Sequence, residues 1–128
     1  MRKILCLVVL MALIVGLAGC SSEENSLGYV QISGEEAMNM MAEQEDYVIL
    51  DVRTPEEFAE KHIVGAVNLP NEEIGEEPIE ELPDLDQLIL VYCRSGNRSK
   101  QASEKLGKLG YTNVYEFGGI NEWNGDVE

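Results

Sequence analysis

The 128-residue chain contains little cysteine, little histidine and few basic residues. Two of its three cysteines, Cys6 and Cys20, lie within the first twenty residues, so only Cys93 and the single histidine, His62, remain in the rest of the chain. One thiol and one imidazole cannot supply the nitrogen and sulfur ligands of a usual zinc site. We therefore expect neither a metal site nor a cofactor.

The scarcity of basic residues gives the chain a formal net charge of −15, from 9 basic and 24 acidic residues. Such a chain is soluble and does not attract nucleic acid or anionic lipid headgroups through its overall charge. Five of the nine basic residues nevertheless fall between positions 94 and 108, directly after Cys93. This distribution predicts that positive charge gathers beside the thiol.

The first nineteen residues have the pattern of a secretory signal. Arg2 and Lys3 precede the apolar run 4–15, which is short for a membrane span and is followed by small residues. The run 17–20 (Leu-Ala-Gly-Cys) resembles a bacterial lipobox, in which the cysteine carries the lipid. We therefore expect 1–19 to be a lipoprotein signal peptide, Cys20 to be lipidated, and 20–28 to be a flexible tether that leaves the protein outside the cytoplasm on a membrane. An ordinary signal peptide with a cysteine near its end is the alternative.

Residues 29–128 are enough for one domain with a single core. Apolar segments predict strands at 29–32, 47–50, 67–69, 88–92 and 114–117. Helical spacing, with capping boxes at Ser33 and Thr54, predicts helices at 33–42, 55–61 and 99–109. A short, solvated helix with a loop is predicted within 71–81, and Gly118-Gly119 is predicted to turn into a last short helix that contains Trp123. This alternation predicts an α/β domain with an open, mostly parallel sheet of about five strands and helices on both faces.

The segment Cys93–Ser99 (Cys-Arg-Ser-Gly-Asn-Arg-Ser) follows the most apolar strand and precedes a helix. A helix that starts near Ser99 directs its free amides and the positive end of its dipole at the loop before it. Arg94 and Arg98 add positive charge, and Gly96 allows the backbone to curl. Such surroundings favour a thiolate at Cys93 and bound anions next to it. A buried, inert cysteine is the alternative, and the polar, cationic flank argues against it.

The length of this loop bears on the electrophile that the thiol attacks. Four residues separate Cys93 from Arg98, whereas a cysteine phosphatase usually needs five between the cysteine and the arginine that holds the phosphoryl group. Ser99 occupies that next position and has no guanidinium. The tighter loop favours a smaller electrophile, such as the sulfane sulfur of thiosulfate or of a persulfide.

Four motifs resemble a single-domain rhodanese, a sulfurtransferase, over about 29–123. They are 50–58 (Leu-Asp-Val-Arg-Thr-Pro-Glu-Glu-Phe), 62–70 (His-Ile-Val-Gly-Ala-Val-Asn-Leu-Pro), the cysteine loop, and 118–123 with Gly118-Gly119 and Trp123. The resemblance implies a rhodanese-like fold for 29–128 and a two-step transfer through a Cys93 persulfide. It makes His62 a structural residue at a helix end, and Asp51 a loop-organising partner, together with Arg53, rather than a general base.

The resemblance also implies the binding residues and the partners. The residues expected to hold the donor and the terminal sulfur are Arg94, Ser95, Gly96, Asn97, Arg98 and Ser99. The expected partners are a small anionic sulfur donor and a thiol or cyanide acceptor, with membrane contact only through the lipid, no nucleic acid, and a monomeric chain. Two other readings stay open. One is a non-catalytic persulfide carrier, redox sensor or docking module, and the other, less favoured, is a phosphatase or arsenate reductase on the same fold.

Overall fold

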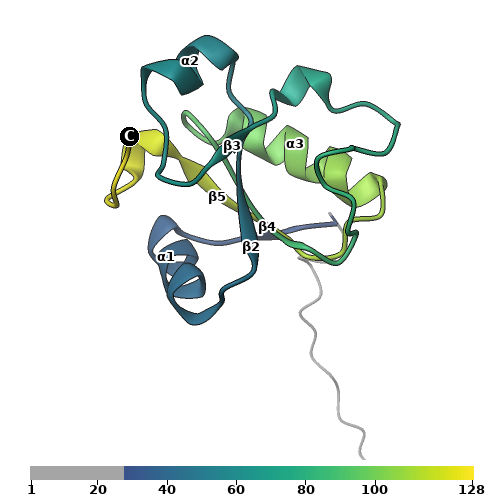
Figure 1. Ribbon diagram of the computed structural model, residues 1–128, viewed down its shortest axis with the longest axis horizontal. Coiled ribbons are helices and arrows are strands. Elements are labelled where there is room, and N and C mark those ends of the chain that lie inside the picture. Colours follow the sequence, from purple (N-terminus) through teal and green to yellow (C-terminus); the bar gives the residue numbers. More distant parts are fainter. Residues whose placement is uncertain (1–27) are drawn as a thin grey trace, which may run out of the picture.

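The computed structural model describes residues 28–128 and shows one five-stranded sheet with helices on both faces (Figure 1). The strand order is β1-β5-β4-β2-β3, and every pairing in it is parallel. The strands are β1 (Val30–Gln31), β2 (Tyr47–Asp51), β3 (Val67–Asn68), β4 (Leu88–Cys93) and β5 (Val114–Gly119). The helices are α1 (Gly34–Glu43), α2 (Pro55–Glu60) and α3 (Asn97–Lys108), with short 3-10 turns η2 (Asn71–Glu73) and η3 (Ile120–Glu122). The predicted fold class is confirmed.

The central strand β4 is buried along its whole length, as its continuous apolar sequence predicts. Side chains alternate along a strand, so successive residues pack on opposite faces of the sheet. Ile89, Val91 and Cys93 join the cluster that contains Leu106 of α3, whereas Leu90 belongs to a second cluster. That second cluster contains Ala37 of α1. The alternation therefore directs the side chain of Cys93 toward the layer of α3.

Two helices begin at capping boxes that the sequence predicts. Ser33 accepts a hydrogen bond from the backbone N–H of Glu36, whose carboxylate accepts from the N–H of Ser33. Thr54 and Glu57 form the same reciprocal pair at α2. Such caps satisfy amides that have no partner within the helix. The second box also fixes the position of Glu57, which contacts the cysteine loop.

The structure corrects several predicted boundaries. Helix α3 begins at Asn97 rather than Ser99, because Gly96, at φ 114°, ends the loop and its carbonyl accepts the first intrahelical bond from Lys100. Gly118 and Gly119 continue β5 instead of forming a turn, since Gly119 pairs with Cys93. The last helix is the single turn η3, which ends before Trp123 rather than containing it.

The acidic segment 71–81 is also less regular and less solvated than predicted. It has one 3-10 turn, η2, and no α-helix. Asn71, Ile74 and Ile79 are buried, and Leu82 just beyond them is buried as well. Packing of these side chains, together with Pro78 within the segment, prevents a continuous helix with one solvent-exposed face.

Within residues 28–128, no helix is both long enough and apolar enough to cross a membrane. The predicted signal peptide 1–19, the lipid site Cys20 and nearly all of the tether 20–28 lie outside the described residues. Those expectations, and the domain boundary at residue 29, remain predictions.

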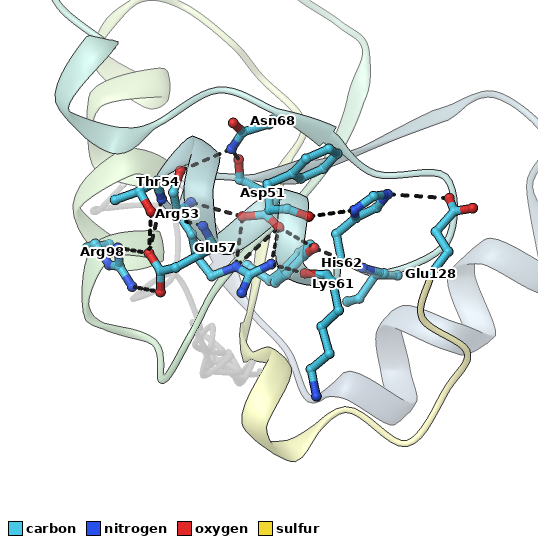
Figure 2. A network of polar contacts seen from close by, with 12 residues as sticks. Asp51, Arg53, Thr54, Glu57, Lys61, His62, Asn68, Arg98 and Glu128 are labelled. Carbon is cyan, nitrogen blue, oxygen red and sulfur yellow. Dashed lines mark hydrogen bonds and ion pairs between the residues drawn. The ribbon is translucent and has the colours of Figure 1, made fainter.

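A buried ion pair joins β2 to the turn that follows it (Figure 2). Asp51 accepts two hydrogen bonds from Nε of Arg53, at 3.0 and 3.2 Å, and one from Nη2 at 2.7 Å. The hydroxyl of Tyr92 in β4 donates to the same carboxylate at 2.5 Å. Burial raises the pKa of Tyr92, and the bond to Asp51 raises it further. The pair thereby ties the ends of the two neighbouring strands together.

Replacing Asp51 with Asn should cost about 3–5 kcal/mol of unfolding free energy, because Arg53 is left as a buried charge without its counter-charge. Tyr92→Phe removes the hydrogen bond to Asp51 and the one that Tyr92 accepts from the N–H of Ile63, but it keeps the ion pair, so it should cost less, about 2 kcal/mol. Urea unfolding followed by circular dichroism measures both values. Equal losses in the two variants would contradict a dominant role for the ion pair.

Candidate active site

Cys93 is the last residue of β4, and its side chain lies beneath the N-terminus of α3. The residue is 1% exposed and forms no disulfide. The backbone N–H of Gly96 donates to Sγ at 3.0 Å, so the loop folds back over the sulfur as its glycine predicts. An amide and a helix N-terminus that face one sulfur stabilise negative charge on it.

Two glycines allow the loop to lie this close to β5. Gly96 has a φ of 114°, which side-chain-bearing residues rarely adopt. Gly119 has an ordinary backbone conformation, but a Cβ there would lie 2.0 Å from the carbonyl oxygen of Arg94. The same carbonyl accepts a hydrogen bond from the N–H of Asn121. The loop is therefore fitted against the end of β5, and only glycine permits the contact at position 119.

Ser99 lies between the thiol and a buried carboxylate that the sequence analysis missed. Its Oγ is 3.4 Å from Sγ of Cys93 and donates to Oε2 of Glu116 at 2.5 Å. Glu116 is 1% exposed and also accepts from the N–H of Gly118 and from the side-chain amide of Gln31. The serine proton is directed toward β5, which leaves an oxygen lone pair to accept from a protonated thiol. A glutamate on the buried face of an otherwise apolar strand was the available signal.

The remaining loop residues are more open. Arg94, Ser95 and Asn97 are exposed, and two clefts adjoin the loop. A cleft of about 410 Å³ is lined by Ser95, Gly96 and Lys100, among others. A second, of about 420 Å³, is lined by Arg53, Glu57, Glu60, Lys61, Arg94, Ile120 and Asn121. A larger hollow of about 600 Å³ lies at the other end of α3, beside Lys105 and Leu109, and contains no loop residue.

The predicted concentration of positive charge beside the thiol is only partly correct. Lys105 and Lys108 lie in the last turn of α3, roughly 10–15 Å along the helix from Arg98. Lys105 donates to the carbonyl and side-chain oxygens of Asn71, and Lys108 lies 3.9 Å from Glu104. Helix geometry thus places two of the five basic residues of the sequence cluster away from the sulfur.

Arg98 does lie next to the loop, but its guanidinium is occupied. Nη1 donates to Oε1 of Glu57 at 2.8 Å, and Nη2 donates to Oε2 at 3.1 Å (Figure 2). These bonds raise the pKa of Arg98 and lower that of Glu57 to about 2. Glu57 is the second residue of the candidate site that the sequence did not predict, because 41 positions separate it from Arg98.

Asp51, Arg53 and His62 form a structural network rather than part of the cysteine loop. Arg53 also donates to the carbonyl of Lys61, and no hydrogen bond among the described residues joins Asp51 to 93–99. His62 stacks on Phe58 and donates from Nδ1 to the Phe58 carbonyl. Its Nε2 lies 3.4 Å from the carboxylate of Glu128 (Figure 2). These contacts hold the region after α2 and leave the imidazole away from the sulfur.

The fold and the loop define an open, parallel α/β domain that holds a lone thiol at the N-terminus of a helix. Residues 33–126 match the family of rhodanese-like domains. The chain therefore belongs to the rhodanese family, as its sequence motifs predict.

Several known proteins are similar to this chain in sequence or in structure. Thiosulfate sulfurtransferase PspE of Escherichia coli (strain K12) is 40% identical over 73 residues, which cover 57% of this chain and 70% of that protein. Thiosulfate sulfurtransferase GlpE of Pseudomonas entomophila is 36% identical over 96 residues, which cover 74% of this chain and 84% of the relative. A solved structure described as rhodanese with anions from E. coli superposes with a TM-score of 0.59 at 35% identity, over 64% of this chain and 96% of that one.

The Glu57–Arg98 pair predicts a particular dependence of stability on pH. The folded pKa of Glu57 is about 2, below its ordinary value of 4.5, so the unfolded chain binds more protons between these values. The stabilisation is complete above about pH 5 and is lost as the pH falls from about 4.5 toward 2. The difference in urea midpoint between wild type and Glu57→Gln should shrink over this window. A difference that stays constant from pH 6 to about pH 2.5 would contradict the assignment.

Proposed function

We propose that this protein is a sulfurtransferase that moves sulfane sulfur from thiosulfate or a persulfide donor to a thiophilic acceptor through a Cys93 persulfide. The single observation that carries the proposal is the geometry of Cys93 Sγ. It accepts a hydrogen bond from the Gly96 amide at 3.0 Å, beneath the N-terminus of α3, in a loop in which only four residues separate Cys93 from Arg98. This environment suits a thiolate and, after transfer, an anionic terminal sulfur.

The transfer takes place in two steps. The Cys93 thiolate attacks the outer sulfur of thiosulfate, a new S–S bond forms, and the old S–S bond breaks with its electron pair leaving on sulfite. The product is a Cys93 persulfide anion. In the second step the acceptor, cyanide or a thiolate, attacks the terminal sulfur and regenerates the Cys93 thiolate. No electron donor outside the reactants is required.

The loop residues have separate roles in this proposal. Backbone amides between Arg94 and Ser99 hold the terminal sulfur, while the exposed Arg94 attracts the anionic donor. Ser99, whose hydroxyl donates to Glu116, holds the start of α3 against β5 next to the sulfur. Because Cys93 is buried, a donor reaches it with its terminal sulfur first.

A phosphatase or arsenate reductase is less well supported. Such an enzyme needs a free guanidinium to hold three anionic oxygens, and both outer nitrogens of Arg98 donate to Glu57. Hydrolysis of an aryl phosphate by the purified domain would support the phosphatase hypothesis instead.

Incubation of the purified domain with thiosulfate and cyanide should produce thiocyanate. Cys93→Ser should reduce the rate to the uncatalysed level, because the oxygen cannot form a persulfide. Intact mass after thiosulfate alone should show the gain of one sulfur atom on wild type and none on the variant. If Cys93 takes up sulfur but transfers it neither to cyanide nor to any of several thiols, the result would favour a persulfide carrier. The absence of loading with thiosulfate and with persulfide donors would refute the proposal.

We also propose that the protein works outside the cytoplasm as a lipoprotein, with diacylglycerol on Cys20 and 20–28 as a tether. The proposal is supported by the order of residue types in 2–20, where two basic residues are followed by an apolar run and then by small residues that end at Cys20. Mass spectrometry of the protein isolated from a bacterial envelope should find an N-terminal peptide that starts at lipidated Cys20. Replacement of Cys20 by Ser should release the protein from the membrane fraction. An N-terminal peptide that begins elsewhere without lipid would contradict this location.

A further inference from the structure

The Glu57–Arg98 ion pair is a charge-neutral unit that joins α2 to the cysteine loop, and its Glu57 half lines the cleft that also contains Arg94. Glu57 projects from α2, and both of its carboxylate oxygens accept from the two outer nitrogens of Arg98 in the first turn of α3. The Arg98 side chain is 28% exposed and that of Glu57 is 22% exposed, so neither charge is fully screened by water. A planar guanidinium held in this forked way has little freedom to turn toward another anion.

This pair includes a residue of the cysteine loop itself. Arg98 is the fifth residue after Cys93, and its pKa is raised first by the hydrogen bonds to Glu57 and to a smaller degree by the thiolate form of Cys93. Glu57 and the exposed Arg94 line the same cleft of about 420 Å³. An anionic donor that enters this cleft meets the exposed charge of Arg94 directly, and it meets the charge of Arg98 only behind the carboxylate of Glu57.

The effect on binding depends on the charge of the donor. A free guanidinium attracts a doubly charged anion about twice as strongly as a singly charged one at the same distance. A neutral ion pair has no net charge, so most of this difference in attraction between the two anions is lost. The carboxylate of Glu57 therefore weakens the binding of a dianionic donor more than it weakens the binding of a monoanionic one.

We propose that Glu57 is a specificity-determining residue that, by occupying Arg98, lowers the preference of this site for doubly charged sulfur donors relative to singly charged ones. This inference rests on the proposed sulfurtransferase function. It assigns the favoured donor class as persulfides and thiosulfonates with one negative charge rather than inorganic dianions.

Two stable donors isolate the charge. Thiosulfate carries two negative charges, and methanethiosulfonate carries a methyl group in place of one charged oxygen. Each delivers its outer sulfur to the Cys93 thiolate as one S–S bond forms and one breaks, with sulfite or methanesulfinate as the leaving group. Single-turnover loading of Cys93, followed by intact mass across a range of donor concentrations, gives the donor's dissociation constant and the loading rate separately.

Glu57→Gln and Glu60→Gln form a matched pair of variants. Gln at position 57 can still accept from the amide of Thr54, so the start of α2 is retained, while the second carboxylate oxygen for Arg98 is lost. Glu60 lines the same cleft, and Glu60→Gln removes the same charge without touching Arg98. Any effect of net charge alone is therefore common to both.

In Glu57→Gln, the ratio of thiosulfate to methanethiosulfonate loading efficiency should rise about threefold to fivefold, the range expected for releasing a partly exposed ion pair. The change should lie in the dissociation constant for thiosulfate and leave the maximal loading rate unchanged. Glu60→Gln should alter the ratio less than twofold, since an exposed charge is screened by solvent. In the double variant Glu57→Gln, Arg98→Gln the ratio should return near the wild-type value, because a neutral pair is replaced by two neutral side chains.

The outcomes separate this inference from the function on which it rests. If wild type loads neither donor, the sulfurtransferase proposal fails and this inference fails with it. If wild type loads both donors but Glu57→Gln leaves the ratio unchanged, or changes it as Glu60→Gln does, only the inference is overturned. If Glu57→Gln does not fold, as judged by circular dichroism, the double variant decides, because a ratio well above or below wild type contradicts the neutral-pair argument.

Discussion

Burial of β4 on both faces is the constraint on which the fold and the site depend. All six of its residues are buried, and its side chains alternate between the layer of α3 and the opposite layer. Because Ile89 and Val91 pack toward α3, Cys93 faces the same way at the end of the strand. The first turn of α3 then lies over the sulfur, and the Gly96 amide reaches it. The strand's alternation thus selects the environment of the thiol.

Carboxylates hold the cysteine loop in place from two sides. Glu116 binds the Ser99 hydroxyl from β5, and Glu57 binds Arg98 from α2. These contacts fix the loop, but they also lower the net positive charge around it, because each brings an acidic group to a loop residue. The site is consequently less cationic than the run of basic residues in its sequence suggests. The exposed Arg94 is left as the loop cation without a carboxylate partner among the described residues.

The sequence predicted the features that depend on neighbouring residues. The α/β alternation, the capping boxes at Ser33 and Thr54 and the parallel sheet all followed from local patterns, and the structure agrees. The errors arose where packing overrides a local pattern. The segment 71–81 bends to bury Ile74 and Ile79 instead of forming a solvated helix, and Gly118-Gly119 extends β5 because Gly119 pairs with Cys93. A helical rise of 1.5 Å per residue carried Lys105 and Lys108 away from the loop that they follow in sequence.

The sequence by itself determined that a thiol stands at the end of a buried strand, in a short loop that leads into a helix, because strand burial, glycine freedom and helix capping act over a few residues. Only the tertiary structure decided which acidic groups meet that loop. The strand order β1-β5-β4-β2-β3 places β2 and β5 on either side of β4, and so brings Glu57 and Glu116 to Arg98 and Ser99. Those contacts span 41 and 17 positions, and they depend on the packing of strands and helices that no local pattern encodes.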